Sequence, residues 1–374
     1  MQNPFIVSGN IPDEYFCDRQ IETDTLIRLL TNGNNVVLIS PRRMGKSGLI
    51  HHCYKKAELK TGYNTVFFDI LQTASLQEFT FLFGKSIFES LMPGNKKLAT
   101  IFIQALKSLA GKFSFNPTTG VPSFSIQLGD ISQPQFTLEE IFNFLDSTSL
   151  PNIIAIDEFQ QIANYPEKNV EAILRSHIQR CKCSNFIFAG SQQHLMTEMF
   201  LSQNRPFYQS TSFMMLEAIP KQVYCDFAFR LFEINDKNIH KEDIMNLYDR
   251  FGGCTFYMQK VLNEAFSRTE RGQKCSKAEL DHALDAILES NTGLYMELLS
   301  TIPTRQKELL ISIAKTEPVS GITSSDFINR NGLQSASSVQ AATKKLIERN
   351  LISKSMATYS LTDKFLAVWL VRNY

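Results

Sequence analysis

Residues 35–47 read NVVLISPRRMGKS, an apolar run followed by a short basic loop that ends in Gly45-Lys46-Ser47. The apolar run predicts a strand, and the residues after Ser47 have the pattern of a helix. A strand, a tight loop and a helix N-terminus bring backbone N–H groups and the positive end of the helix dipole to one point, which suits a triphosphate. The spacing is that of a phosphate-binding loop, G-x-x-x-x-G-K-S, except that Ser40 replaces the first glycine.

Two side chains of this loop have predicted roles toward ATP and Mg²⁺. Lys46 is expected to neutralise the β- and γ-phosphates, and the Ser47 hydroxyl is expected to bind magnesium. The alternative is a strand-to-helix turn that contains a chance lysine, because the motif lacks its first glycine. The nucleotide-binding residues predicted on the loop are Pro41, Arg42, Arg43, Met44, Gly45, Lys46, Ser47 and Gly48.

A pair of acidic residues follows another buried run. Residues 152–158 read NIIAIDE, so Asp157 lies at the carboxyl end of the predicted strand and Glu158 directly beyond it. Asp157 is expected to hold the magnesium ion through water, and Glu158 is expected to polarise an attacking water. The second acid favours hydrolysis over transfer to a small acceptor. The alternative is that both acids only solvate the end of the strand.

Two more positions complete the predicted catalytic set. Ser191 follows the run 186–190 and is expected beside the γ-phosphate, where it positions water or senses the phosphate. Capping of the next helix is an equally good role for Ser191. Arg205 is a candidate for the cation that stabilises the developing charge, as is the Arg42–Arg43 pair. Each of these arginines also fits a structural role.

Five short apolar runs predict the strands of one sheet. Each run is continuous rather than alternating, as in parallel strands that are buried on both faces. Helical patterns separate most of them, so the predicted class is an α/β P-loop NTPase with a five-stranded parallel sheet. The strand count matches the ASCE branch, in which a further strand lies between the phosphate-loop strand and the acidic strand. The predicted strands are 36–40, 65–70, 153–157, 186–190 and 213–216.

The rest of the chain predicts two further domains. Four helical stretches and no strand-like run lie between residues 218 and 300, which indicates an all-helical lid. Three helices and two short apolar segments then follow in the order of a winged helix-turn-helix, with Ser335 as the N-cap of its third helix. The predicted domains are an ATPase domain over 1–217, a helical lid over 218–300 and a winged helix over 301–374.

Composition restricts the class of protein. The chain has 374 residues, 38 of them Lys or Arg and 37 Asp or Glu, and its apolar content is that of a globular protein. Seven scattered cysteines fit reduced thiols better than disulfide bridges. No apolar run is long enough for a membrane helix, and the N-terminal residues do not resemble a secretory signal. We therefore expect no membrane association and a cytoplasmic location.

The C-terminal domain is basic. Residues 301–374 contain ten basic and five acidic residues, while the preceding residues carry a small net negative charge. The predicted helix 336–349 carries Lys344 and Lys345 after a series of small polar residues. Weak DNA binding through residues 335–349 is therefore predicted. Winged helices also pack against proteins, so contact with a protein is the alternative.

In their order, these motifs resemble those of the archaeal-type ATPases, which belong to the STAND class and are relatives of the AAA+ and origin-recognition ATPases. The resemblance rests on the loop 41–47, on the run Asp-Glu-Phe-Gln at 157–160 and on Gly190-Ser191. Members of the family also begin with an hhGRExE box that lies against the adenine. Residues 16–22, FCDRQIE, fit this box, which implies that Asp18 and Arg19 contact the nucleotide.

The resemblance implies ATP and Mg²⁺ as ligands, and we expect slow ATP turnover that serves as a conformational switch. It covers nearly the whole chain, including a lid turn at 252–255, where Gly-Gly-Cys-Thr replaces the family's GG-x-P. Two alternatives stay open: a module that binds nucleotide without hydrolysis, and a DNA-binding regulator whose ATPase body is a dimerisation platform. A protein partner is expected but not identified, and a homo-oligomer is a further option.

Overall fold

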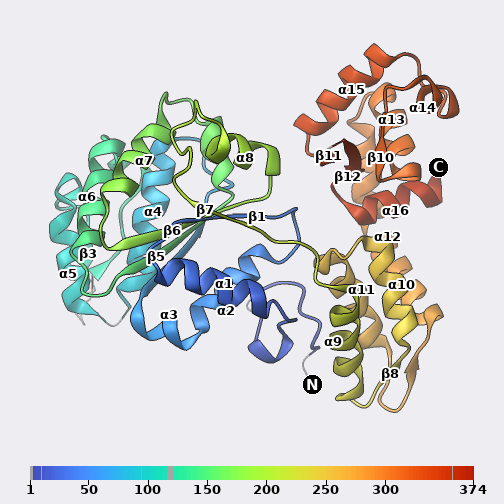
Figure 1. The fold of residues 1–374 in the computed structure, drawn as a ribbon, viewed down its shortest axis with the longest axis horizontal. Helices are drawn as coiled ribbons and strands as arrows, with labels where there is room; N and C mark the ends of the chain where they lie inside the picture. The colour runs from blue at the N-terminus through green and yellow to red at the C-terminus, as the bar shows by residue number, and fades with distance from the viewer. Residues whose placement is uncertain (1–2, 10, 94, 116–121, 356) are drawn as a thin grey trace. The chain divides into compact units, whose positions relative to one another are not determined.

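The structure, a computed structural model, describes residues 3–9, 11–93, 95–115, 122–355 and 357–374 (Figure 1). Contacts between residues divide the chain into two compact units. The first unit is Asn10–Glu217. The second unit combines Met1–Gly9 with Ala218–Tyr374.

A five-stranded parallel sheet forms the centre of the first unit. Its strand order is β2-β5-β6-β1-β7, so β6 lies between β1 and β5, as the sequence predicted. Every residue of β1 and β5 is buried, which explains why their sequences are continuously apolar. The strands are β1 (Val36–Ile39), β2 (Asn64–Asp69), β5 (Asn152–Asp157), β6 (Ser184–Gly190) and β7 (Ser212–Met215).

Helices cover both faces of this sheet (Figure 1). One face packs against α1 (Gln20–Thr31), α2 (Lys46–Lys55) and α3 (Ala57–Gly62). The other face packs against a phenylalanine-rich layer. This layer consists of α4 (Leu76–Leu91), α5 (Lys96–Ala105), α6 (Pro134–Asp146), α7 (Val170–Arg180) and α8 (Gln193–Leu201). The arrangement leaves the carboxyl ends of the parallel strands along one edge, which is where open α/β sheets bind ligands.

Some local features of this unit differ from the sequence prediction. The helical pattern predicted after Ser47 forms two helices, because Lys56 between α2 and α3 has an extended backbone. Helices α1 and α6 were not predicted, although both are amphipathic.

The smaller elements are an antiparallel pair, β3 (Ser114–Phe115) with β4 (Pro122–Ser123), and the 3-10 turns η1 (Asp13–Tyr15), η2 (Lys107–Leu109), η3 (Leu128–Asp130) and η4 (Phe159–Asn164).

The second unit begins with a helical region. Its helices are α9 (Lys221–Glu233), α10 (Lys241–Phe251), α11 (Thr255–Arg268) and α12 (Lys277–Ser300). The prediction of helices alone missed a two-residue parallel pair, β8 (Asn238–Ile239) with β9 (Lys274–Cys275). This pair forms because the segments before α10 and α12 are extended and lie side by side, with the Asn238 N–H donating to the Gln273 carbonyl at 3.0 Å.

A winged helix follows. It contains α13 (Thr304–Thr316), β10 (Val319–Ser320), α14 (Ser325–Arg330), α15 (Ala336–Glu348), and the hairpin β11 (Ile352–Ser355) and β12 (Thr358–Leu361). The Ser335 side chain caps α15 by accepting the Ser338 N–H, as predicted. The chain ends in α16 (Lys364–Asn373), whose Phe365 ring lies 4.9 Å from that of Tyr257 in α11. Helix α16 packs on the helical region, and both parts lie in one compact unit. The predicted border between the helical lid and the winged helix at residue 300 therefore stays a prediction.

Gly190, the last residue of β6, provides a test of packing in the first unit. A Cβ atom at this position would lie 2.5 Å from the buried Met196 side chain and 2.7 Å from Gln160 Oε1. Gly190→Ala should therefore lower the free energy of unfolding by about 1–3 kcal/mol in denaturant titrations. Gly62→Ala is the matched control, because a Cβ there meets nothing within 4 Å. An unchanged free energy in Gly190→Ala would contradict the packing described.

Candidate functional site

The loop between β1 and α2 has the backbone that a phosphate-binding loop requires. Gly45 has φ +90°, a value that strains any residue with a Cβ, and it directly precedes the first residue of α2. Ser40 is not among the described residues with positive φ, and its N–H donates to the Gly190 carbonyl at 3.3 Å. It thus extends the pairing of β1 with β6. Serine in place of the motif's first glycine therefore causes no backbone strain in this chain.

Lys46 lies between the two predicted acids. Its Nζ is 3.0 Å from Asp157 Oδ1 and 3.5 Å from Glu158 Oε1, and its side chain is almost fully buried. The Ser47 hydroxyl donates to Asp157 Oδ2 at 2.5 Å. The fold brings these residues together because β1 and β5 are parallel strands that end at the same edge of the sheet.

Glu158 is held by donors from two different elements. Its φ of +56° turns the chain sharply between β5 and the 3-10 turn η4. Its Oε2 atom accepts a hydrogen bond of 2.7 Å from the Ser191 hydroxyl and one of 2.5 Å from Gln160 Nε2. The sequence analysis missed Gln160 as a site residue. The available signal was its position two residues after Glu158 in the quoted run.

Ser191 does not cap the helix that follows it. The N-cap of α8 is Gln192, which makes no capping bond through its side chain. The Ser191 hydroxyl instead donates to Glu158, and Arg42 Nε reaches the same hydroxyl at 3.4 Å. The structure therefore connects one of the predicted loop arginines with the predicted catalytic acid through Ser191.

Asp69 is a second residue that the sequence analysis missed. It is the last residue of β2 and pairs in register with Asp157 on β5, so the two acids end neighbouring strands. Burial raises the pKa of the Asp69 carboxyl above its ordinary value, the Leu71 N–H opposes this shift, and the charges of Asp157 and Glu158 add to it. The signal was an acid near the carboxyl end of the predicted strand 65–70, one residue before its last, which resembles the position of Asp157 in its strand.

The segment before α1 lies against the phosphate loop. Asp18 and Arg19 both have positive φ, and the Arg19 side chain is 4% exposed. The Arg19 guanidinium donates to the Met44 carbonyl at 3.2 Å and pairs with Glu22 at 2.7 Å. Arg19 therefore supports the backbone of the loop directly.

Arg205 has contacts of a different kind. Its guanidinium pairs with Glu171 of α7 at 2.9 Å and with Glu198 of α8 at 2.7 Å. These contacts join two helices of one layer. The structure does not bring Arg205 into contact with Lys46, Ser47 or the two acids that follow β5, although the sequence analysis grouped it with them.

The oxygen donors at the site suit magnesium. Mg²⁺ is usually bound by one or two carboxylates together with substrate phosphates and water. The Asp157 carboxylate and the Ser47 hydroxyl are the matching donors here, and they are already adjacent. Among the described residues, no group of three or more His, Cys, Asp or Glu side chains forms a metal site by itself.

Comparison with known families identifies the chain. Residues 16–261 match the family described as "ATPase domain predominantly from Archaea". The chain belongs to this family. Residues 293–372 of this archaeal-type ATPase match a second family, described as "Probable winged helix domain". The predicted resemblance and fold class are confirmed, whereas assignment to the STAND or AAA+ classes stays a prediction.

Solved structures share the fold of this archaeal-type ATPase. The Walker-type ATPase of Pyrococcus abyssi is similar with a TM-score of 0.68 at 17% identity, over 98% of this chain and 99% of that one. The ORC2 protein of Aeropyrum pernix, in ADPNP–ADP complexes, gives 0.62 at 14% identity, over 99% and 96%. The ORC1 protein of the same organism, in complex with DNA, gives 0.50 at 14% identity, over 96% and 93%. A search of curated proteins with this sequence finds no match.

Within the described ranges, none of the helices is long and apolar enough to span a bilayer.

The ion pairs of Arg205 lead to a testable expectation about Glu171. Burial raises the pKa of the Glu171 carboxyl, Arg205 opposes that rise, and Glu198 adds to it. Arg205→Ala should lower the free energy of unfolding by about 1–3 kcal/mol near pH 8, because a buried carboxylate loses its partner. The loss should shrink toward pH 5, because the folded protein then binds a proton at Glu171 more tightly than the unfolded chain does.

The control for this experiment is Arg180→Ala. Among the described residues, the Arg180 guanidinium bonds within its own helix, to Ser176, so its removal should change stability by no more than about 0.5 kcal/mol. ATP turnover per folded molecule should be unchanged in Arg205→Ala. A large loss of turnover at unchanged stability would instead support the catalytic role that the sequence suggested.

Proposed function

We propose that this protein binds magnesium-ATP at the loop 41–48 and hydrolyses it slowly, with the nucleotide state acting as a conformational switch. The single observation that carries the proposal is the position of Lys46, whose buried ammonium lies between Asp157 and Glu158. Membership of an ATPase family supports it. The ADPNP–ADP complexes described for the structurally similar ORC2 protein are compatible with it.

Binding of ATP would replace carboxylates by phosphates as the anions that contact the Lys46 ammonium. The Lys46 ammonium now contacts two carboxylates, and the phosphates of ATP would replace part of these contacts. The N-terminus of α2, which begins at Lys46, adds unpaired N–H groups and the positive end of its dipole. Ser47 and Asp157 would hold the magnesium ion, which offsets the negative charge that develops on the phosphates during hydrolysis.

Hydrolysis would depend on Glu158. Its Oε2 atom already accepts two hydrogen bonds, whereas Oε1 faces the Lys46 ammonium. Once Lys46 binds phosphate, Oε1 is the oxygen that can orient a water and take its proton. The water oxygen bonds to the γ-phosphorus as the bond to the bridging oxygen breaks, and ADP leaves with the electron pair.

The first prediction for this function concerns affinity. ATP at about 100 times its Kd should stabilise the wild type by about 2.7 kcal/mol, read as a rise in Tm. Lys46→Ala should lose most of that ATP-dependent rise, whereas Lys60→Ala, which removes an exposed lysine of α3, should keep it. An equal rise in wild type and Lys46→Ala would place the nucleotide elsewhere.

A second prediction concerns turnover. Glu158→Gln should keep ATP affinity and lower kcat by about 10²–10⁴-fold, the usual contribution of a general base. Asp157→Asn should instead weaken the part of ATP binding that depends on magnesium. Steady-state turnover and titrations with and without Mg²⁺ measure these effects. Turnover that Glu158→Gln leaves intact would refute the role of Glu158, and a wild type that binds without turnover would favour the non-hydrolysing alternative.

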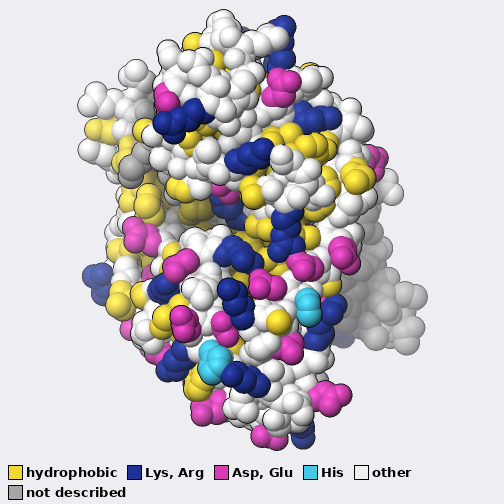
Figure 2. Space-filling view, turned by 90° about the vertical axis from the view of Figure 1, so that its right-hand side faces the viewer, with side chains coloured by type: hydrophobic (Ala, Val, Ile, Leu, Met, Phe, Trp, Pro, Cys, Tyr) yellow, Lys and Arg dark blue, Asp and Glu magenta, His cyan; other side chains and the backbone are white. Residues whose placement is uncertain are grey.

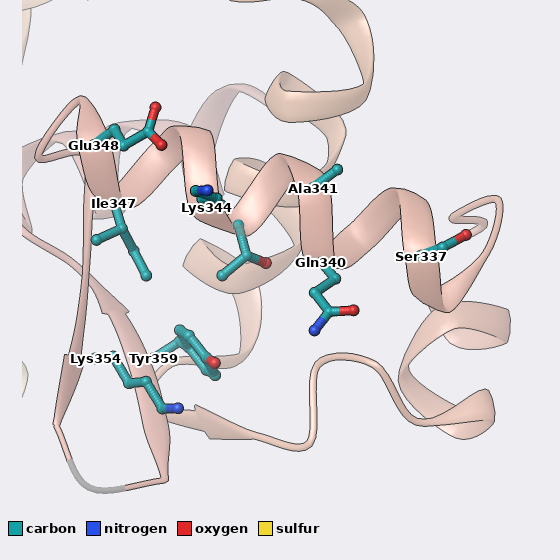
Figure 3. Close-up of a pocket in the computed structure, with 9 residues that line it drawn as sticks. Ser337, Gln340, Ala341, Lys344, Ile347, Glu348, Lys354 and Tyr359 are labelled. Carbon is teal, nitrogen blue, oxygen red and sulfur yellow. The ribbon is translucent and has the colours of Figure 1, made fainter.

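DNA contact by the winged helix is the second candidate function. A groove of about 640 Å³ lies between α15 and the hairpin β11–β12 (Figure 3). Gln340 and Ile347 point from α15 toward the hairpin, where Lys354 and Tyr359 face them (Figure 3). Lys344 on the helix and Lys354 on the hairpin place a positive charge on each wall, and Glu348 adds a negative charge to the helix wall. On the face shown in Figure 2, Lys and Arg are scattered among Asp and Glu, which favours weak binding.

The groove changes which lysines are expected to contact phosphates. The sequence analysis paired Lys344 with Lys345. In the structure, Lys345 Nζ forms an ion pair of 2.8 Å with Glu348, whereas Lys344 and Lys354 line the groove. Lys354 is therefore the better second contact, because Glu348 already offsets the charge of Lys345.

The matching prediction is a change in salt dependence. Replacing Lys344 and Lys354 together by alanine should weaken binding to all duplexes about equally and flatten the slope of log K against log salt by about 0.9 per lost contact. Lys345→Ala is the control and should change the slope less. Absence of any mobility shift at low salt, with or without ATP, would assign the groove to protein contacts. A shift that depends on ATP would favour the regulator alternative.

A further inference from the structure

Two donors converge on a single oxygen of Glu158. Gln160 Nε2 comes from η4, Ser191 Oγ comes from the end of β6, and both bind Oε2. Two hydrogen bonds from separate elements to one oxygen prevent the carboxylate from rotating. The other oxygen, Oε1, is thereby held toward Lys46.

The contact between Glu158 and Gln160 needs an unusual backbone. Residues two apart on a helix do not face each other. Glu158 lies just outside η4 with φ +56°, a left-handed conformation that costs energy for a residue other than glycine. This turn allows the Gln160 side chain to return to the carboxylate. Strain of this kind is typical of functional positions.

Gln160 also leaves one of its own polar atoms unsatisfied. The side chain is 1% exposed, and its Oε1 atom has no hydrogen-bond partner among the described residues. The side chain fits there only because residue 190 is glycine, since a Cβ at that position would lie 2.7 Å from Gln160 Oε1. An apolar side chain of similar size would avoid the unpaired oxygen. The hydrogen bond to Glu158 is the interaction that only the amide supplies.

We infer that Gln160 is a positioning residue for hydrolysis, which fixes the Glu158 carboxylate with Oε1 toward the reacting phosphate. The inference rests on the proposed ATPase function. Gln160 itself does not touch the substrate, and it acts through the orientation of the base. Misplaced supporting contacts of this kind typically lower a rate by about 10–100-fold.

Gln160→Met tests this inference, because methionine has a similar volume and no amide. We expect kcat to fall about 10–100-fold, with ATP affinity within about twofold of the wild type and a Tm that does not decrease. A purely structural glutamine would give the opposite result, a lower Tm with normal kcat per folded molecule. The matched control is Gln161→Met in the same turn, because the Gln161 amide donates to the Thr73 carbonyl and not to the site.

A double-mutant comparison tests whether Gln160 acts through Glu158. In single-turnover measurements, Gln160→Met should lower the rate little further when Glu158→Gln is already present. A full additional loss in that background would overturn the inference, and so would an unchanged kcat in Gln160→Met. A wild type that turns over no ATP would overturn the proposed hydrolysis together with this inference, so the two failures are distinguishable.

Discussion

The buried ion pair of Lys46 with Asp157 and Glu158 is the constraint on which the rest of the site depends. Burial of any one of these charges alone would be costly, so each requires the others. The pair connects the first residue of α2 to the end of β5, across the strand β6 that separates β5 from β1. It therefore fixes the N-terminus of α2 beside the two acids. Under the proposed function, phosphate binding would exchange the anions that contact this one cation.

The residues around the ion pair of Lys46 further restrict the geometry of the site. Arg19 supports the loop through the Met44 carbonyl, and the Ser40 N–H continues the strand pairing into the loop. On the other side, Ser191 and Gln160 hold the carboxylate of Glu158. Each of these contacts joins elements that lie far apart in the sequence or turns the chain sharply, so together they hold the side chains of the site in place.

In the second unit, α16 makes the helical region and the winged helix one packed body. Phe365 lies against Tyr257 and Phe251, and Trp369 Nε1 donates to Thr292 on α12. These contacts bury aromatic surface, so separating the two parts would expose it to water. Under the proposed switch function, a movement of the helical region would therefore carry the winged helix with it.

The sequence by itself determined the apolar runs that form the strands, the α/β fold class, and the residues of the phosphate loop and of the acidic pair. These features follow from local signals, namely continuous apolar runs and the glycine-lysine-serine spacing. It also predicted the place of β6 between β1 and β5. Only the tertiary structure decided that Gln160 binds Glu158, that Asp69 stands beside Asp157, that Arg205 joins α7 to α8, and that Lys345 is paired while Lys354 lines the groove. These facts depend on strand register, on the left-handed turn at Glu158 and on packing between elements distant in the chain, which no local pattern encodes.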